Sequence, residues 1–468
     1  MQKYKIVSSV NQDIFRAYDI RGVANRDLTE DCVYTLGIAI GSEAQRRGAK
    51  AVIIGRDGRV SGPVLLQALS LGLRASGCDV INIGEVTTPM VYFATYTLKT
   101  HSGIALSGSH NPPEYNGLKI VLAGETLSGQ QILDLHTRIV KQDFCSGNGR
   151  EEEINMVDDY ITAITSRIKL NRSLNIVVDC GNGVAGKIAP VLVRKLGCNV
   201  TELYCEVDGS FPHHQPDPAE PKNMQDLVAE VKKQRADLGL AFDGDADRVG
   251  VVTNQGEIIA ADRLLMLLAK DVLAHNPGGK IVFDVKATRC LPEQIKKFGG
   301  IPIMCKTGHS FLKAKIKEVG ALLAGEVSGH VFYKDRWYGF DDGIYAAARL
   351  LELLSNDVRT GSEIFAALPN AINTPEIKVP FPDDKKFDFI ARLQKEAYFP
   401  GADINTIDGV RAEFKDGFGL VRVSNTTPYL IMRFEGDTQE ALNRIRHEFY
   451  REMIKLEPGM EKQLIRAQ

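Results

Sequence analysis

One order of segments occurs three times along most of this chain, and it limits the possible folds more than any other feature. Each occurrence runs from an apolar strand and a polar turn through a helical segment to a second strand, a second helix and a third strand that ends in an unusual loop. The copies begin at AVIIG (51–55), NIVVDC (175–180) and KIVFDV (280–285). A repeated unit of about a hundred residues is too long for a solenoid. The repetition therefore predicts three sister domains of α/β type.

Strand direction and the end of the chain complete the predicted fold. Apolar, β-branched runs that alternate with segments of helical period indicate largely parallel strands. Another apolar segment follows each unusual loop, so we expect the third strand of each unit to turn back into an antiparallel neighbour. After Pro369 the sequence changes to a Pro-punctuated stretch, a hairpin-like GLVRVSNTTPYLIMRFEG and an amphipathic helix. We therefore predict three sister α/β domains with mixed, mostly parallel sheets and a smaller C-terminal α+β domain, around a central cleft.

The length of 468 residues supports several domains rather than one. The changes of pattern place the boundaries so that each domain carries one unusual loop. The predicted domains are residues 1–155 with a serine loop, 156–258 with an acidic loop, 259–369 with a Glu-Ser-His loop and 370–468 with an Arg-Ser-Asn-Thr loop.

Charge and composition exclude several classes of function. The 57 basic and 59 acidic side chains leave a formal net charge of −2, so no excess positive field is available for a nucleic-acid backbone or an anionic membrane. The N-terminus lacks the apolar core of a signal peptide, and no run reaches the ~18 apolar residues of a membrane span. The eight Cys are scattered without a C-x-x-C pair, which favours reduced thiols over a disulfide or zinc framework. We expect a cytoplasmic protein that has no obligate protein partner.

The sharpest chemical signal is LAFDGDADRVG, in which an apolar strand delivers Asp243, Asp245 and Asp247. Three carboxylates this close repel one another unless a cation neutralises them. In a straight strand the outer two would lie ~13 Å apart at about 3.3 Å per residue, so the chain must curl, and Gly244 permits a curl. Hard oxygen ligands favour Mg²⁺ or Ca²⁺, and Mg²⁺ commonly shares its coordination with a substrate phosphate. The alternative is a solvated acidic turn.

The matching loop of the first unit, ALSGSHNPPEYNGLKIV, offers Ser109 as a nucleophile beside His110. Gly108 and a Pro-Pro pair are typical of a tight turn, and we expect this turn to expose the serine hydroxyl. A serine hydroxyl is a weak nucleophile that needs a base or a metal-bound electrophile. The predicted metal site in the matching loop of the second unit could neutralise a phosphate carried on Ser109. Alone, the segment is also consistent with an ordinary turn.

The other two loops suit the recognition of vicinal hydroxyl groups and of a phosphate. AGEVSGHVFY carries Glu326 and Ser328, which can accept and donate hydrogen bonds to vicinal hydroxyls, and His330, which titrates near neutrality. RVSNTTP combines a guanidinium, hydroxyls, an amide and backbone N–H groups, a set that suits a phosphate dianion. Its polar residues are Arg422, Ser424, Asn425, Thr426 and Thr427. We expect the four loops to meet in a cleft between the domains.

These four loops, in this order, resemble those of the α-D-phosphohexomutase family. The resemblance extends from FRAYDIRG (15–22) to RVSNTTP (422–428), and GEVSGH with SNTTP is closer to the mannose and glucose branch than to the glucosamine branch. It implies that Ser109 is the phosphorylated catalytic serine, and that this serine and the three aspartates hold Mg²⁺. The sequence departs from the common family pattern at Ser107 and Ala246, and neither is a predicted ligand.

The resemblance also implies roles for residues outside the sharpest motifs. Catalytic roles near the serine are implied for Arg21, Lys119, Arg248 and His330, and the choice of acid and base among the first two and His330 stays open. Substrate contacts are implied for Tyr18, Lys286, His309, Glu326, Ser328, Arg422, Ser424, Asn425, Thr426 and Thr427.

The implied activity is the interconversion of hexose 1-phosphate and hexose 6-phosphate, with mannose and glucose as the sugars. Phospho-Ser109 passes its phosphoryl group to the free hydroxyl, and the resulting 1,6-bisphosphate turns over and returns its other phosphate to the serine. Glucose 1,6-bisphosphate is the implied activator, and hexose phosphates are the implied binding partners. The alternatives are a phosphoglucosamine mutase, a haloacid-dehalogenase-type phosphotransferase with Asp243 as nucleophile, and a catalytically silent sugar-phosphate-binding protein.

Overall fold

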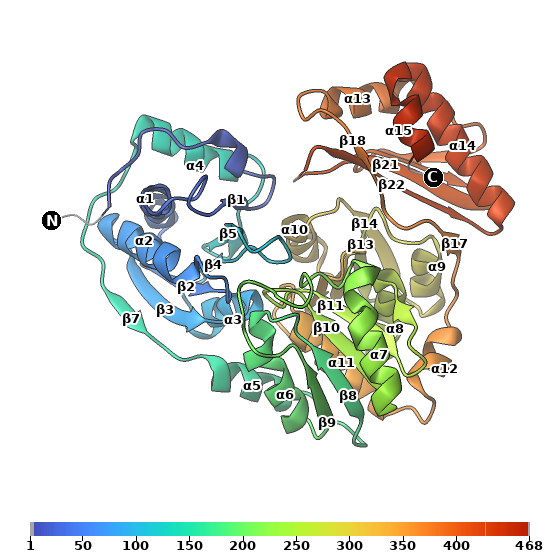
Figure 1. Cartoon of the computed structure of the whole chain (residues 1–468), viewed down its shortest axis with the longest axis horizontal. Helices are drawn as coiled ribbons and strands as arrows, with labels where there is room; N and C mark the ends of the chain where they lie inside the picture. The colour runs from blue at the N-terminus through green and yellow to red at the C-terminus, as the bar shows by residue number, and fades with distance from the viewer. Residues whose placement is uncertain (1–3, 426, 467–468) are drawn as a thin grey trace.

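The computed structural model describes residues 4–425 and 427–466, and in this part of the chain it contains four β-sheets (Figure 1). Over the same residues, none of the helices is both long and apolar enough to cross a membrane. The sheets follow one another along the chain, and each defines one unit of the fold.

The first three sheets share one strand order, as the repeated sequence predicts. In each, the first strand pairs in parallel with the second on one side and with the third on the other, and the strand after the loop returns antiparallel to the third. In this order the strands are β2 (Ala51–Arg56), β3 (Asp79–Glu85), β4 (Gly103–Leu106) and β5 (Tyr115–Leu122) in the first unit, β8 (Asn175–Asp179), β9 (Asn199–Leu203), β10 (Leu238–Phe242) and β11 (Val249–Thr253) in the second, and β13 (Lys280–Asp284), β14 (Ile301–Cys305), β15 (Leu323–Gly325) and β16 (Val331–Tyr333) in the third.

Short strands extend these sheets at their edges. The first sheet gains three and the second gains one. They are β1 (Ile20–Val23) and β6 (Glu125–Thr126) beside β5, β7 (Glu151–Glu153) beside β3, and β12 (Ile258–Ile259) beside β11.

Helices connect the strands, and capping residues mark several of their starts. The helix α3 (Thr88–Thr97) begins after Thr87, whose side chain accepts a hydrogen bond from the Met90 N–H, and Pro89 occupies its first turn. The start of this helix places Thr88 of the first unit in contact with Asp245 of the second. The other helices of the first three units are α1 (Glu30–Arg46), α2 (Gly62–Ala75), α4 (Gln130–Lys141), α5 (Val157–Thr165), α6 (Ala189–Lys195), α7 (Gln225–Gln234), α8 (Ala261–His275), α9 (Cys290–Lys297), α10 (His309–Val319), α11 (Gly343–Ser355) and α12 (Gly361–Ala366).

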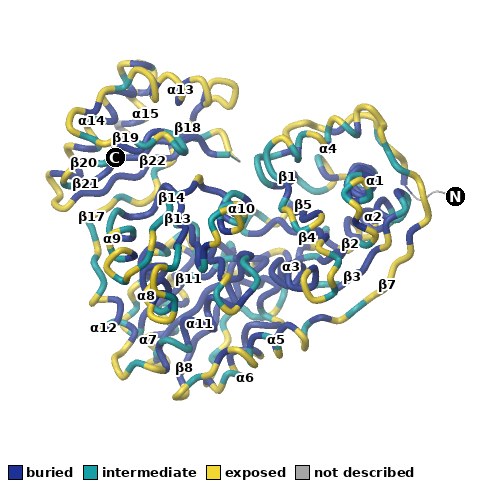
Figure 2. Tube along the Cα trace, turned by 180° about the vertical axis from the view of Figure 1, so that it is seen from behind, coloured by how far each residue is buried: buried dark blue, intermediate teal, exposed yellow. Residues whose placement is uncertain are grey.

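One continuous apolar core joins the first three units. It includes Phe93 of α3, Phe242 of β10 and Trp337 of the third unit, and the Phe93 and Trp337 rings stack at 5.8 Å. Figure 2 shows the buried segments gathered where these units meet. Burial of large aromatic side chains across the boundaries fixes the relative position of the units. Because this core crosses the predicted boundaries, the division of the chain into domains stays a prediction.

The fourth unit is an antiparallel sheet with a core of its own, formed under its helices around Phe434 and Phe449. Two arginines of this sheet attach it to the third unit: Arg411 donates to the Ala287 carbonyl at 2.7 Å, and Arg433 donates to the Lys286 carbonyl at 2.9 Å. The predicted four-part α/β architecture is therefore confirmed. The elements of this unit are β17 (Ile372–Asn373), β18 (Ile377–Pro380), α13 (Lys386–Glu396), β19 (Asp403–Asn405), β20 (Val410–Phe414), β21 (Gly417–Val423), β22 (Tyr429–Gly436), α14 (Gln439–Leu456) and α15 (Glu461–Arg466).

Candidate active site

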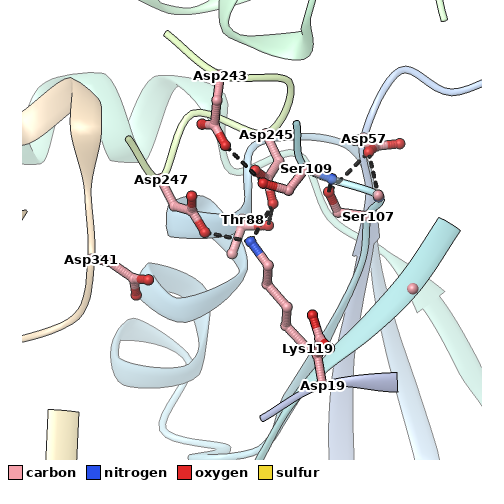
Figure 3. A network of polar contacts seen from close by, with 12 residues as sticks. Asp19, Asp57, Thr88, Ser107, Ser109, Lys119, Asp243, Asp245, Asp247 and Asp341 are labelled. Atoms are coloured by element: carbon pink, nitrogen blue, oxygen red, sulfur yellow. Dashed lines mark hydrogen bonds and ion pairs between the residues drawn. The ribbon is translucent and has the colours of Figure 1, made fainter. Parts of the chain in front are cut away.

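The loops singled out in the first three units follow equivalent strands, and the structure brings them together. Ser109 Oγ, after β4, donates to Asp243 Oδ2, after β10, at 2.8 Å (Figure 3). Arg248 Nε, at the end of the same acidic loop, donates to His330 Nε2, which precedes β16, at 3.0 Å. Two short polar contacts thus connect the serine loop, the acidic loop and the Glu-Ser-His loop.

Ser109 lies in a tight turn in the left-handed backbone region, with φ of 49°, where a non-glycine residue is strained by roughly 1–2 kcal/mol. Its N–H donates to Ser107 Oγ at 2.7 Å, and its Oγ lies 3.1 Å from His110 Nδ1. The expectation of an exposed hydroxyl is wrong, because Ser109 is only 1% exposed and the acidic loop of the second unit covers it. The nucleophile therefore lies in a site shielded from water.

Lys119 of β5 reaches into the acidic loop, as Figure 3 shows. Its ammonium lies 2.7 Å from Asp245 Oδ2 and also contacts Asp247. Burial alone would lower the pKa of Lys119, but the two carboxylates outweigh burial and raise it. Burial, followed by repulsion from Asp247 and Asp245, raises the pKa of Asp243 well above its usual value. Lys119 and Arg248, whose Nε lies 3.9 Å from Asp243 Oδ2, therefore place two positive charges against three carboxylates.

The acidic loop curls as predicted, but a different residue makes the turn. The left-handed residue is Ala246, with φ of 62°, whereas Gly244 has no positive φ. Gly244 is needed for space, since a Cβ there would lie 2.4 Å from the Ser109 carbonyl oxygen. The expected role of Gly244 in the curl is therefore corrected. The glycine allows the acidic loop to approach the serine loop closely, and Ala246 provides the curl.

The chemistry of this cluster fits a divalent cation. Carboxylate oxygens of Asp243, Asp245 and Asp247 lie within 4.8 Å of one another, and all three residues are buried. Within the described part of the chain, no residue donates a hydrogen bond to the buried Oδ1 atoms of Asp245 and Asp247. Buried carboxylate oxygens without partners are costly, and a hard cation satisfies them.

His330 lies where the second and third units meet. Its Nε2 accepts a hydrogen bond from Arg248, so that nitrogen carries no proton, while Nδ1 lies 3.3 Å from Asp341 Oδ2. The His309 ring lies 5.9 Å from the His330 ring, and the Tyr18 ring packs edge-on against His309 at 5.1 Å. The structure thus groups four of the predicted site residues on one side of the acidic loop.

Arg21 of β1 joins this group from the first unit. Its guanidinium donates to Asp19 Oδ2 and to the side-chain oxygen of Asn111 in the serine loop. Burial would lower the pKa of Arg21, but the Asp19 carboxylate outweighs it and the pKa is raised. Arg21 is therefore a fixed cation beside the nucleophile.

Glu326 and Ser328 form a small network in the third unit. Glu326 Oε2 accepts a hydrogen bond from Ser328 Oγ at 2.9 Å, and Glu326 Oε1 accepts one from the Gly308 N–H at 3.1 Å. Glu326 thereby links its own loop to the start of the helix that carries His309.

Arg422 connects the fourth predicted loop to the third unit by way of Asp408. Arg422 Nε donates to Asp408 Oδ2 at 2.9 Å, and the same oxygen accepts the Thr307 N–H at 3.0 Å. The Nη2 of Arg422 is buried and makes no hydrogen bond to any described residue. Within the loop, the hydroxyls of Ser424 and Thr427 bond at 2.6 Å. Asn425 is half-buried, and Thr426 lies outside the described residues.

Sequence reasoning missed several residues that hold this site together. Thr88 Oγ1 donates to Asp245 Oδ2 at 2.6 Å, which ties the first unit to the acidic loop. Asp57 follows β2, the central strand of the first unit, and strand ends of this kind commonly carry functional side chains. The position of Asp57 directly after a central strand was therefore the signal that could have identified it. The missed residues are Asp57, Arg59, Thr88, Ser107, Lys313 and Asp341.

Comparison with known proteins agrees with this geometry. The family model described as phosphoglucomutase/phosphomannomutase, alpha/beta/alpha domain I, matches residues 12–145, the models for domains II and III match 158–256 and 260–372, and the model for the C-terminal domain matches 376–452. The chain belongs to the phosphoglucomutase/phosphomannomutase family, within the α-D-phosphohexomutases.

Individual relatives are similar over nearly the whole chain. A phosphomannomutase/phosphoglucomutase of Pseudomonas aeruginosa is 56% identical over 96% of this chain and 96% of its own. A phosphoglucomutase of Neisseria gonorrhoeae is 52% identical over 95% and 97%. The crystal structure of a phosphoglucomutase/phosphomannomutase family protein from Burkholderia thailandensis superposes with a TM-score of 0.92 at 49% identity, covering 96% of this chain and 99% of that one.

The ion pair between Lys286 and Glu376 gives a prediction about pH. The two charges lie 2.9 Å apart. The Lys286 ammonium lowers the pKa of Glu376 to about 2, because its attraction outweighs burial, which alone would raise that pKa. The unfolded value is about 4.3, so the pair stabilises the fold above that pH and its contribution disappears as the pH falls toward 2. We expect Glu376→Gln to lower the free energy of unfolding at pH 7 by about 1–2 kcal/mol, after allowance for partial exposure, and by clearly less at pH 3.

Urea unfolding of both proteins at pH 7 and pH 3 measures this difference. Glu220→Gln is the matched control, because Glu220 forms an exposed ion pair with Lys378 at 3.2 Å that contributes little. An equal effect of Glu376→Gln at both pH values would contradict the assigned ion pair.

Proposed function

We propose that this chain interconverts hexose 1-phosphates and hexose 6-phosphates of mannose and glucose through a phosphorylated Ser109 and a 1,6-bisphosphate intermediate. The observation that carries the proposal is the buried contact between Ser109 Oγ and the cluster of three aspartates. Its similarity to mutases at 50–56% identity supports the same reaction. The predicted cytoplasmic location stays an expectation from the sequence.

Each half of the reaction moves one phosphoryl group between Ser109 Oγ and a sugar hydroxyl. Phospho-Ser109 loses its phosphoryl group to the free hydroxyl of the substrate, the P–O bond to the serine breaks, and a bisphosphate forms. The bisphosphate then reorients, and its other phosphoryl group returns to the serine. Positioning and charge stabilisation provide most of the catalysis in such transfers. Lys119, Arg21 and Arg248 are fixed cations around the serine that would stabilise the charge on the phosphoryl group.

We propose that Asp243, Asp245 and Asp247, together with an oxygen on Ser109, hold Mg²⁺. When bound, Mg²⁺ would neutralise charge on the transferring phosphoryl group. Two of the carboxylates also attach the acidic loop to the first unit, because Asp243 accepts a hydrogen bond from Ser109 and Asp245 accepts one from Thr88 of α3. Glucose 1,6-bisphosphate is the proposed activator, since it would restore phosphoserine if the intermediate escapes.

Of the three residues proposed for proton transfer, His330 suits the role of base. Lys119 and Arg21 are held in their charged forms by neighbouring carboxylates, so both suit donation of hydrogen bonds rather than acceptance of a proton. The Nε2 of His330 carries no proton where it accepts the Arg248 hydrogen bond. We propose that this nitrogen takes the proton of the attacking sugar hydroxyl when that hydroxyl replaces Arg248 as its hydrogen-bond donor.

The phosphate that does not react is proposed to bind the fourth unit. Arg422 offers a buried nitrogen that has no acceptor among the described residues, and Ser424, Asn425 and Thr427 carry hydroxyl and amide groups in the same loop. Glu326 and Ser328 are proposed to bind the sugar hydroxyls, with Lys286, His309 and Tyr18 beside them. Such a division would let one set of sugar contacts serve both orientations of the intermediate.

The first test replaces the nucleophile. We expect Ser109→Ala to reduce mutase turnover by orders of magnitude, because no other group in the site carries the phosphoryl, while substrate binding persists. A coupled assay on mannose 1-phosphate and glucose 1-phosphate measures the turnover. Ser102→Ala, a buried serine in the same unit, is the control and should retain activity. Turnover of Ser109→Ala at the wild-type level would exclude the phosphoserine, and phosphate labile to hydroxylamine would instead indicate an aspartyl phosphate.

The second test concerns the metal. Asp245→Asn removes one negative ligand, so we expect weaker Mg²⁺ binding by calorimetry and a higher Mg²⁺ concentration for half-maximal activity. Asp271→Asn is the control, since Asp271 pairs with Arg349 away from the acidic loop. If Asp245→Asn leaves both measurements at their wild-type values, the triad does not hold the ion.

The third test separates the phosphate clamp from the chemistry. Arg422 is proposed to contact the distal phosphate before, during and after transfer, and loss of such a shared contact raises KM more than it lowers kcat. A charge-assisted hydrogen bond contributes ~1.5–3 kcal/mol, so we expect Arg422→Ala to lower kcat/KM by about 10- to 100-fold and to increase the need for glucose 1,6-bisphosphate. Steady-state kinetics with and without the activator checks this. Arg444→Ala, an exposed arginine of the same unit, is expected to behave as wild type, and an unchanged KM for Arg422→Ala would place Arg422 outside the site.

A further inference from the structure

Arg59 binds the back of the serine loop with its entire guanidinium group. It is 1% exposed, and an arginine carries five N–H donors in a fixed planar arrangement. Each donor has an acceptor: Nε donates to Asp57 Oδ2, and the two terminal nitrogens donate to four backbone carbonyls. The carbonyls belong to Ser109 (2.8 Å), Asn111 (2.6 Å), Pro112 and Tyr115 (2.9 Å).

The loop is shaped around this side chain. A Cβ on Gly108 would lie 2.3 Å from Arg59 Nε and 2.4 Å from its Cζ, so the glycine before the nucleophile makes room for the guanidinium. Asp57 Oδ2 also accepts hydrogen bonds from Ser107 Oγ at 2.9 Å and from the Gly108 N–H at 3.0 Å. Arg59 and Asp57 together satisfy loop carbonyls and loop donors that would otherwise be buried without partners.

This arrangement acts directly on the nucleophile. Ser109 has a strained left-handed conformation, which persists only where the surroundings enforce it. Arg59 holds the Ser109 carbonyl, and the same carbonyl faces Gly244 at the closest approach of the acidic loop. Arg59 therefore holds the backbone of the nucleophile at the point where the acidic loop approaches it.

The fourth unit repeats the device with another buried cation. Lys386, at the start of α13, is 5% exposed, and its Nζ donates to the Ser424 carbonyl at 2.8 Å and to the Thr427 carbonyl at 3.0 Å. These two bonds fix the backbone of the loop from the side of α13, and the hydroxyls of Ser424 and Thr427 bond each other within it. This observation is independent of Arg59, because the two cations lie in different units.

We propose that Arg59 and Lys386 are positioning residues: Arg59 sets the phosphoryl-carrying loop and Lys386 sets the loop that binds the distal phosphate. The proposal rests on the proposed function, and it predicts that the loss of each cation changes a different kinetic parameter. Arg59 acts on transfer, which depends on the placement of Ser109 to within about 1 Å. Lys386 acts on binding, since the loop that it shapes contacts the phosphate that does not react.

The test measures kcat, KM and the phosphoserine signal in paired variants. Arg59→Lys keeps the charge but replaces the planar five-donor group by three donors, and we expect kcat to fall about 10- to 100-fold with KM within about threefold, together with a shifted or broadened ³¹P resonance of phosphoserine. Arg349→Lys is the control, because Arg349 is an equally buried arginine that bonds Asp271 outside the site. It is expected to lower thermal stability while leaving kcat and the ³¹P resonance unchanged.

Lys386→Met is expected to raise KM for the hexose phosphate about 10-fold with kcat within about threefold. Lys385→Met, its exposed neighbour, is the control and is expected to match wild type. If Arg59→Lys does not fold, Asp57→Asn is measured in its place, because Asp57 holds the same loop; it is expected to lower kcat.

The outcomes separate the inference from the proposed function. Wild-type protein without phosphoserine and without mutase activity overturns both. If the wild type is active but Arg59→Lys keeps the wild-type kcat and ³¹P resonance, only the role of Arg59 is overturned. The same holds for Asp57→Asn where that variant is used instead. Unchanged KM in Lys386→Met overturns the role of Lys386 alone.

Discussion

The structure depends on a cluster of buried negative charge at the junction of the first two units. Asp243, Asp245 and Asp247 come from one short loop, and Lys119 of the first unit supplies the ammonium that contacts two of them. Desolvation of three carboxylates is unfavourable unless cations lie close, so the acidic loop is stable only when the first unit presents its lysine and its serine loop. The charge requirement thus determines which surfaces of the two units meet, and it places Ser109 against Asp243.

The repeated topology explains how one site can draw on three units. Equivalent strands β4, β10 and β15 each end in a loop at an equivalent corner of a sheet, and the shared aromatic core holds these corners toward one another. The serine, the acidic loop and His330 therefore belong to one packed body. The fourth unit has a separate core and reaches the site through Arg422, Asp408 and the buried arginines of its sheet. The reacting groups lie between units that share a core, and the loop proposed to bind the distal phosphate lies in a unit that takes no part in that core.

Much of the fold could be predicted from sequence because it rests on local pattern: apolar strands, helical periods and loop composition recur within each unit, so the three sister units and the antiparallel fourth could be recognised. The loops that carry Ser109, Asp243 and His330 could be found because each follows an equivalent strand of the repeat and because their side chains suit one another chemically. Tertiary features were inaccessible. The burial of Ser109 depends on a loop that lies far along the chain, and the left-handed turn falls at Ala246, where a glycine two residues earlier was the local expectation. Arg59 and Lys386 look like ordinary surface residues in sequence, since their acceptors are carbonyl groups brought near by folding.

A buried loop that binds a phosphate is stable only if its own carbonyl groups also have hydrogen-bond donors. A loop that presents N–H and hydroxyl groups to an anion must direct its carbonyl oxygens elsewhere, and in a buried site those oxygens need donors. In the first unit Arg59 supplies four such bonds, and in the fourth unit Lys386 supplies two. Each cation is also paired with a carboxylate, Arg59 with Asp57 at 3.2 Å and Lys386 with Asp383 at 2.6 Å, so its main effect is to satisfy backbone carbonyls rather than to add net charge. The fixed five-donor guanidinium lies behind the loop where bonds are proposed to form and break, and the single ammonium lies behind the loop that is proposed only to bind. The more rigid group thus holds the loop proposed for phosphoryl transfer, which needs more precise positioning than phosphate binding does.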